Sequence, residues 1–210
     1  AAMSRRAAMT AAALAAMATL AGCTGGGAGA AAEGDMAMGA AEGAKVTVIE
    51  YASVTCHVCA AWQKENWEAF KAAYVDTNKV RYVFRELPTG PVNVAVAGFM
   101  IARCAGDDKY FDVVHNILAS QDEWQAGVNP RDTLFRIGNG AGLSNQQIEA
   151  CIKNPDNIKA ADARARASQA AGVDGTPAFF VNGVPVVSMG SASGPTMADL
   201  SRAIDAELAK

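Results

Sequence analysis

Residues 45–59 decide the fold: KVTVIEYA (45–52) is followed by SVT (53–55) and CHVC (56–59). The first segment is rich in β-branched and aromatic residues, as strands are. The serine and threonine of the second segment are residues that cap the start of a helix. The two cysteines therefore lie at a predicted turn from a strand into a helix.

A second strand follows this helix and completes a βαβ unit. In residues 56–75, Trp67, Phe70 and Tyr74 recur at the i, i+3, i+7 spacing of one helical face. Residues 79–87, KVRYVFREL, again have the composition of a strand. The short connections predict a parallel strand pair with a right-handed crossover.

The rest of the chain divides into an insertion and a return to the first domain. Residues 92–171 show helical patterns and no convincing strand, which predicts an inserted helical subdomain. Beyond it, two short strand-like segments flank Asn182-Gly183, a strong hairpin signal. Residues 45–91 and 172–210 are therefore expected to form one α/β domain interrupted by the insertion.

The N-terminus has the pattern of an export signal. Arg5 and Arg6 precede residues 7–21, a run of small and apolar residues without a charge. That run is shorter than the roughly 20 residues that cross a bilayer as a helix. Residues 1–22 are predicted to be a signal peptide, because residues 20–23, LAGC, resemble the bacterial lipobox.

In a lipobox the cysteine, here Cys23, is acylated and becomes the first mature residue. Two or three acyl chains would hold the protein on a lipid bilayer, since each buried methylene contributes about 0.8 kcal/mol. The alternative is an ordinary cleavage site with a spare cysteine. Residues 23–44 are mainly Ala, Gly and Met in no periodic pattern, which predicts a flexible tether. We expect a lipid-anchored protein of the periplasm or cell envelope.

The composition narrows the classes of partner and compartment. The 210 residues are 51% hydrophobic and 19% charged, as in a globular protein, and the net charge of -3 gives no reason to expect a nucleic-acid partner. With Cys23 assigned to lipid, an even set of cysteines remains. An oxidising compartment suits such a set. The four are Cys56, Cys59, Cys104 and Cys151.

Cys56 and Cys59 have the spacing of a redox-active pair, because two cysteines in a first helical turn can close a small disulfide ring. Unpaired backbone N–H groups at a helix start favour the thiolate of the leading cysteine. His57, when protonated, adds positive charge beside that sulfur and makes the disulfide more oxidising. Cys56 is therefore the predicted nucleophile, and Cys59 is its deeper partner.

Non-redox interpretations of the pair remain open. One is a zinc site completed by Cys104 and Cys151, although structural zinc sites usually use a second close pair of ligands. Another is a purely structural disulfide between Cys56 and Cys59. A copper carrier fits less well, since His115 is the only other histidine. We expect no metal and no cofactor.

A family resemblance rests on four features taken together. They are the strand end IEYAS (49–53), the C-x-x-C at a helix start, the helical insertion, and GTP (175–177) before a strand. With these features, residues 45–210 resemble the DsbA-like proteins of the thioredoxin superfamily. The resemblance implies an α/β thioredoxin fold with an inserted all-helical subdomain.

Carried over by position, the resemblance assigns roles to individual residues. Cys56 matches the family's nucleophile and Cys59 its buried partner. Pro177 matches a cis-proline facing the disulfide, with Thr176 before it, in a loop that binds an extended substrate peptide. Glu50 matches a buried acid that moves a proton on or off Cys59, which requires a raised carboxyl pKa. The alternative for Glu50 is an exposed strand residue.

The resemblance also pairs Cys104 with Cys151 as a second, structural disulfide, with two buried free thiols as the alternative. The sequence departs from the best-known oxidase of the family, where proline and then histidine separate the cysteines. Here His57 comes first and Val58 second. Thr176 occurs also in isomerase-like and reductase-like relatives, so the direction of electron flow stays open.

Three functions follow, in order of preference. The first is a thiol:disulfide oxidoreductase that introduces disulfides into reduced or unfolded exported proteins, re-oxidised by a DsbB-like or VKOR-like membrane partner. The second is an envelope disulfide reductase or isomerase of the same fold. The third is a non-catalytic, lipid-anchored metal-binding module.

Overall fold

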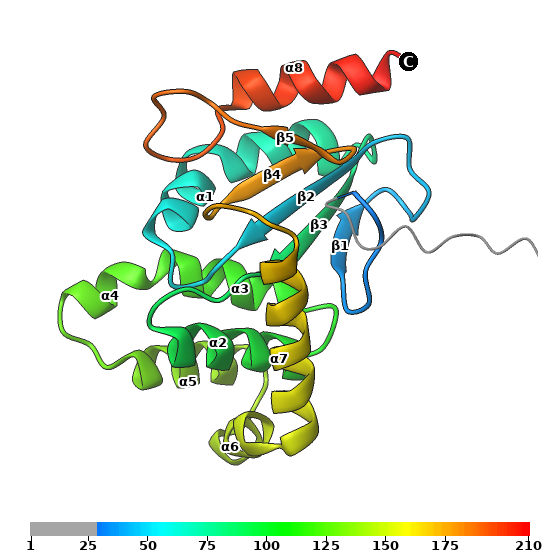
Figure 1. Ribbon diagram of the computed structural model, residues 1–210. Coiled ribbons are helices and arrows are strands. Elements are labelled where there is room, and N and C mark those ends of the chain that lie inside the picture. The colour runs from blue at the N-terminus through cyan, green and yellow to red at the C-terminus, as the bar shows by residue number, and fades with distance from the viewer. Residues whose placement is uncertain (1–28) are drawn as a thin grey trace, which may run out of the picture.

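The computed structural model describes residues 29–210 and is built around a five-stranded sheet (Figure 1). Its strands are β1 Met36–Gly39, β2 Thr47–Ala52, β3 Arg81–Glu86, β4 Ala178–Val181 and β5 Val184–Val186. The strand order is β1-β3-β2-β4-β5. The predicted signal peptide and the lipobox cysteine Cys23 lie outside the described residues.

The predicted βαβ unit forms the middle of the sheet. β2 and β3 pair in parallel, and the helix α1 (His57–Phe70) with the π-helical turn η1 (Lys71–Val75) lies between them in the chain. β4 pairs antiparallel with β2, and β5 with β4, so the hairpin at Asn182-Gly183 forms one edge. Pro185 lies in this edge strand, where its missing N–H costs no ladder bond.

Helices fill the chain between β3 and β4. Figure 1 shows most of them below the sheet, while α7 runs back up to it. They are α2 Val92–Cys104, α3 Tyr110–Ala119, α4 Gln121–Gln125, α5 Pro130–Gly140, α6 Asn145–Lys153 and α7 Pro155–Ala170. A last helix, α8 (Met197–Leu208), follows β5. The predicted α/β fold with an all-helical insertion is confirmed.

The flexible tether predicted for residues 23–44 is wrong for its second half, where β1 pairs antiparallel with the edge of β3. Arg85 binds both carboxylate oxygens of Asp35 at 2.9 Å, and Arg103 donates to the Gly34 carbonyl at 2.7 Å. The groups that hold this segment therefore come from β3 and α2. The composition of this segment does not predict a strand, because the residues that pair with β1 are distant in the sequence.

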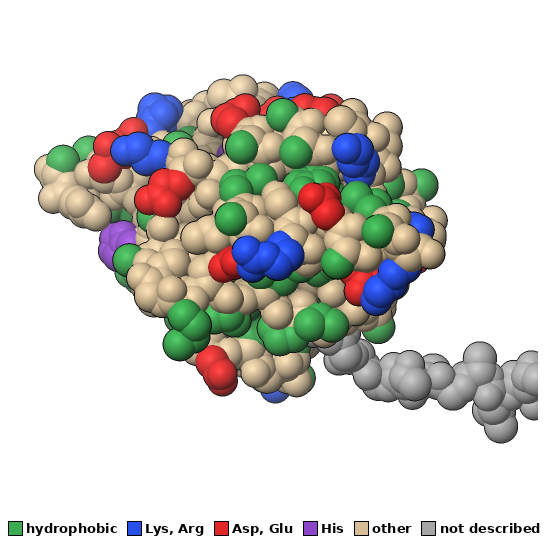
Figure 2. Space-filling model, turned by 90° about the horizontal axis from the view of Figure 1, so that it is seen from above, with side chains coloured by type: hydrophobic (Ala, Val, Ile, Leu, Met, Phe, Trp, Pro, Cys, Tyr) green, Lys and Arg blue, Asp and Glu red, His purple; other side chains and the backbone are tan. Residues whose placement is uncertain are grey.

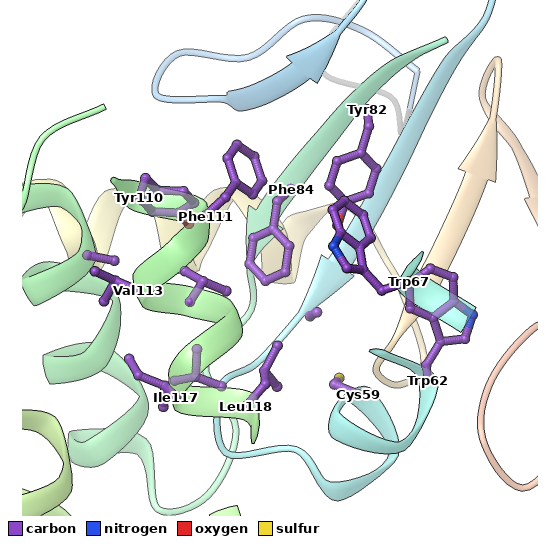
Figure 3. Packing of buried hydrophobic residues seen from close by; sticks show 14 of the residues in the cluster. Cys59, Trp62, Trp67, Tyr82, Phe84, Tyr110, Phe111, Val113, Ile117 and Leu118 are labelled. Atoms are coloured by element: carbon purple, nitrogen blue, oxygen red, sulfur yellow. The ribbon is translucent and has the colours of Figure 1, made fainter. Parts of the chain in front are cut away.

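One continuous core joins the sheet to the insertion (Figure 3). Trp62 and Trp67 of α1 belong to the same buried cluster as Tyr82 of β3 and Phe111 and Ile117 of α3. The rings of Trp67 and Tyr82 have centroids 5.0 Å apart. Since burial of such side chains is the main favourable contribution to folding, the sheet and the insertion stabilise one another.

The surface around α8 carries acidic and basic side chains interspersed, as seen from above in Figure 2. One such pair joins Arg202 to Asp199 along the helix.

Within residues 29–210, no helix combines the length and the apolar character needed to cross a membrane.

Candidate active site

Cys56 and Cys59 lie at the start of α1, as the sequence predicts. Cys56 is the N-cap residue, and its Sγ accepts a hydrogen bond from the backbone N–H of Cys59 at 3.2 Å. Cys56 is half-buried, whereas Cys59 is 1% exposed. Both are free thiols in this structure, which therefore represents the reduced form.

The surroundings of the two thiols separate their proton affinities. Hydrogen bonding with the Cys59 thiol, with further hydrogen bonds from Thr176 and from the backbone of Cys59 and Val58, lowers the pKa of Cys56 to about 6. Burial raises the pKa of Cys59 far above its ordinary range, and the neighbouring Cys56 adds to the effect. At neutral pH Cys56 is thus a thiolate and Cys59 keeps its proton, which matches the roles of nucleophile and buried partner.

Glu50 of β2 lies inside the protein, close enough to the two thiols for their charges to interact. It is 4% exposed, and the Tyr82 hydroxyl donates to its Oε1 at 2.5 Å. Burial raises the pKa of Glu50 to about 7, although the Tyr82 hydrogen bond opposes the shift. The exposed-strand alternative is therefore wrong, and Glu50 can both hold and release a proton near neutral pH. Sequence reasoning missed Tyr82, because it lies opposite Val48 in the β2–β3 register and its hydroxyl reaches Glu50 diagonally, two residues along β2.

Thr176 and Pro177 face the thiols from the loop before β4. The peptide bond between them is cis, and Sγ of Cys56 lies 3.4 Å from the Thr176 carbonyl oxygen, to which it can donate only while it is protonated. An added Cβ at Gly194 would lie 3.0 Å from Cγ of Pro177, so the loop before α8 packs closely on this proline. A mostly apolar groove begins at Val58 and follows the Thr176-Pro177 loop. It ends at β5 and the loop that precedes α8.

His57, the first residue of α1, is exposed beside Cys56. Its Nδ1 lies 3.2 Å from Oε1 of Gln121, the first residue of α4. Gln121 is 4% exposed although it is polar, and it lies 64 residues away from His57 in the chain. Sequence reasoning missed Gln121, because no local signal shows that the insertion reaches the thiol turn.

Cys104 and Cys151 lie apart from this site, in α2 and α6. The structure joins them in a disulfide, the pairing that the family resemblance implies. The two sulfurs of this disulfide are not available as metal ligands. A zinc site built from all four cysteines is therefore excluded. In the part of the chain that the structure describes, no other group of three His, Cys, Asp or Glu side chains could hold a metal ion.

The family to which the chain belongs is established by its sequence. The sequence model described as thioredoxin matches residues 31–206. The chain belongs to the thioredoxin family. The match begins before β1, so it also includes the segment for which the sequence alone predicted a tether.

Individual thioredoxin-family relatives resemble the chain in sequence and in fold. A candidate protein-disulfide oxidoreductase of Rickettsia conorii is 37% identical over 158 residues, which is 72% of this chain and 54% of the relative. The chain thus spans about half the length of that relative.

Solved structures that share the fold include a Wolbachia and a Bacillus protein. α-DsbA1 of Wolbachia pipientis has a TM-score of 0.73 at 22% identity, covering 85% of this chain and 93% of the other. Oxidised BdbD of Bacillus subtilis has a TM-score of 0.72 at 13% identity, covering 84% of this chain and 94% of the other. A thioredoxin-family fold thus brings Cys56, Cys59, His57, Glu50 and the Thr176-Pro177 loop together.

Proposed function

We propose that this thioredoxin-family protein is a DsbA-like thiol:disulfide oxidoreductase that introduces disulfides into exported proteins through Cys56 and Cys59. The observation that carries the proposal is the position of Cys56: it is the half-buried N-cap of α1, its Sγ accepts from the Cys59 N–H, the Cys59 thiol is fully buried, and the Thr176-Pro177 loop faces it. These surroundings lower the pKa of Cys56 to about 6 and so stabilise its thiolate. A stabilised thiolate favours the reduced form of the pair. The corresponding disulfide is therefore a good oxidant.

The reaction begins with the oxidised pair. A substrate thiolate attacks Sγ of Cys56 and forms a mixed disulfide, while the Cys56–Cys59 bond breaks and its electrons pass to the Cys59 sulfur. That sulfur takes up a proton, for which Glu50 is the proposed donor. A second substrate thiolate then attacks the substrate sulfur of the mixed disulfide. The substrate leaves oxidised, and Cys56 leaves as a thiolate.

The two electrons left on the cysteine pair require an external oxidant. We infer a membrane redox partner of the DsbB-like or VKOR-like type, with reduced or unfolded exported proteins as substrates, held at the Thr176-Pro177 loop as extended peptides. The LAGC sequence supports a location in the periplasm or cell envelope with lipid attached at Cys23. Membrane fractionation of the full chain tests that anchor.

Oxidation of a reduced, unfolded test protein, together with the reduction potential of the Cys56–Cys59 pair, tests the function. We expect catalysed disulfide formation and a potential well above the value of about -270 mV typical of thioredoxin. A potential at that level would favour the reductase or isomerase instead. Bound metal with no dithiol exchange would favour the metal-binding module.

Serine variants separate the roles of the two thiols. For this trap the test protein is unfolded but keeps its own disulfides. In Cys59→Ser the Cys56 thiolate attacks a substrate disulfide and releases one substrate thiolate, and the mixed disulfide should accumulate because no Cys59 thiol is present to resolve it. Cys56→Ser should form none, because Cys59 is buried and keeps its proton. Equal trapping by both variants, read from non-reducing gels, would contradict the assignment of Cys56 as the nucleophile.

A further inference from the structure

Gln121 connects the helical insertion to the turn that carries the thiols. Its side-chain amide Nε2 donates to the Val54 carbonyl at 2.7 Å and to the Cys56 carbonyl at 3.1 Å. Its Oε1 lies 3.2 Å from Nδ1 of His57. All three partners belong to the four residues 54–57, and the glutamine is buried against them. A buried amide with every polar atom engaged fixes the groups that it binds.

The chemistry of the partners determines where the hydrogens lie. Two carbonyl oxygens can only accept, so they require the two N–H groups of the Gln121 amide, and Oε1 must face His57. An amide oxygen also only accepts, so Nδ1 of His57 must carry the hydrogen. A neutral imidazole has one N–H, which leaves the lone pair on Nε2.

This arrangement survives a change in the charge of His57. When the imidazole is protonated, both ring nitrogens are donors, and Nδ1 still donates to Gln121. The ring therefore gains or loses its proton at Nε2 without losing the bond that orients it. The same glutamine holds the carbonyl of Cys56, so the ring and the nucleophile are fixed relative to one another.

We propose that Gln121 is a positioning residue of the redox site, which holds His57 in the Nδ1–H form beside Cys56 and leaves Nε2 as the nitrogen that exchanges protons. The inference rests on the proposed oxidoreductase function for its consequence in catalysis. The hydrogen-bond geometry itself does not depend on that function.

The substitution Gln121→Met tests the proposal, since methionine has a similar length and no hydrogen-bonding amide. Gln63→Met is the matched control. Gln63 also joins α1 to the insertion, by donating to the His115 carbonyl at 3.0 Å, but among the described residues the hydrogen bonds of the Cys56 and His57 side chains go to other partners. Nitrogen-15 NMR of the histidine rings reads the tautomer of neutral His57 directly in the whole protein.

We expect Nδ1–H at His57 in the wild type and in Gln63→Met, and a mixture of both tautomers in Gln121→Met. The rate of test-protein oxidation should fall about tenfold in Gln121→Met alone, the size of loss seen when a partner that orients a metal-bound imidazole is removed. The Nε2–H form in the wild type would overturn the proposal, even if Gln121→Met does not fold. If Gln121→Met folds and its His57 shows the same single tautomer as the wild type, the proposal is overturned as well. An inactive wild type with Nδ1–H would instead refute the proposed function and leave the positioning role intact.

Discussion

At the scale of single residues, the burial of Glu50 links stability to pH. Its pKa is about 7 in the folded protein against an ordinary value of 4.5, so the folded state holds a proton that the unfolded state has lost between these values. The stabilisation is fully present below about pH 4.5 and is lost as the pH rises to about 7. For a shift of this size the loss is about 3 kcal/mol.

Glu50→Gln should remove this pH dependence. Urea denaturation of the oxidised protein at several pH values is the measurement, because the disulfide removes the titration of Cys56. Between pH 4.5 and 8 the oxidised wild type should lose up to about 3 kcal/mol of unfolding free energy relative to the variant, since only the smallest cause of the shift, the charge of Cys56, is absent from the disulfide form. His115, whose pKa burial lowers to about 4, acts in the opposite direction but equally in both proteins. Parallel curves would show that Glu50 titrates normally.

Tyr82→Phe is the control for the Glu50 environment. It removes the hydrogen bond that lowers the pKa of Glu50, so the pH at which stability is lost should move upward.

The site residues that the sequence predicted all lie in recognisable local motifs or in the family pattern. Tyr82 and Gln121 lie in neither, because their contacts with the site depend on strand register and on the path of the insertion.

At the scale of secondary structure, the elements that the sequence predicted have strong local signals. The β-branched strands β2 and β3 and the Asn182-Gly183 hairpin are examples. β1 has no such signal, since its sequence MAMG neither alternates nor favours a strand. Pairing with β3 and the Arg85–Asp35 ion pair supply what its sequence lacks.

Gly39 ends β1 and allows a test of its packing. Its φ is +84°, and an added Cβ would lie 2.5 Å from the Val80 carbonyl oxygen. Gly43 has a similar φ of +88° with no atom within 4 Å. Alanine at either position incurs about 1–2 kcal/mol of left-handed backbone strain. Gly39→Ala should lower the free energy of unfolding more than Gly43→Ala does, because the clash with the Val80 carbonyl also displaces β1 from β3. Urea midpoints measure the difference, and equal values for both variants would mean that β1 adapts freely.

At the scale of the whole molecule, the insertion is joined to the sheet by charge as well as by apolar packing. Glu86 of β3 is 4% exposed and binds Arg103 of α2, Tyr110 of α3 and Arg164 of α7. A buried carboxylate with three partners from three helices is costly to expose, because its charge loses all of them at once. Together with the shared core cluster, this contact predicts that sheet and insertion unfold in a single transition.

The disulfide between Cys104 and Cys151 stabilises this unit from within the insertion. It connects α2 to α6 and closes a chain separation of 47 residues, so its main effect is to restrict the unfolded chain. Cys104→Ala with Cys151→Ala should lower the unfolding free energy by about 2–4 kcal/mol. Test-protein oxidation should be retained, because neither residue touches the thiol site.

Cys104→Ala alone separates the chain restriction from packing. Cys104 is exposed and Cys151 is buried, so the single variant breaks the link but keeps the buried side chain at its wild-type size. If the link acts through the unfolded state, the single variant should show most of the loss of the double variant, in one urea transition. If only the double variant is destabilised, the cause is the cavity at Cys151. Two separate transitions would mean that the disulfide, and not the shared core, couples the insertion to the sheet.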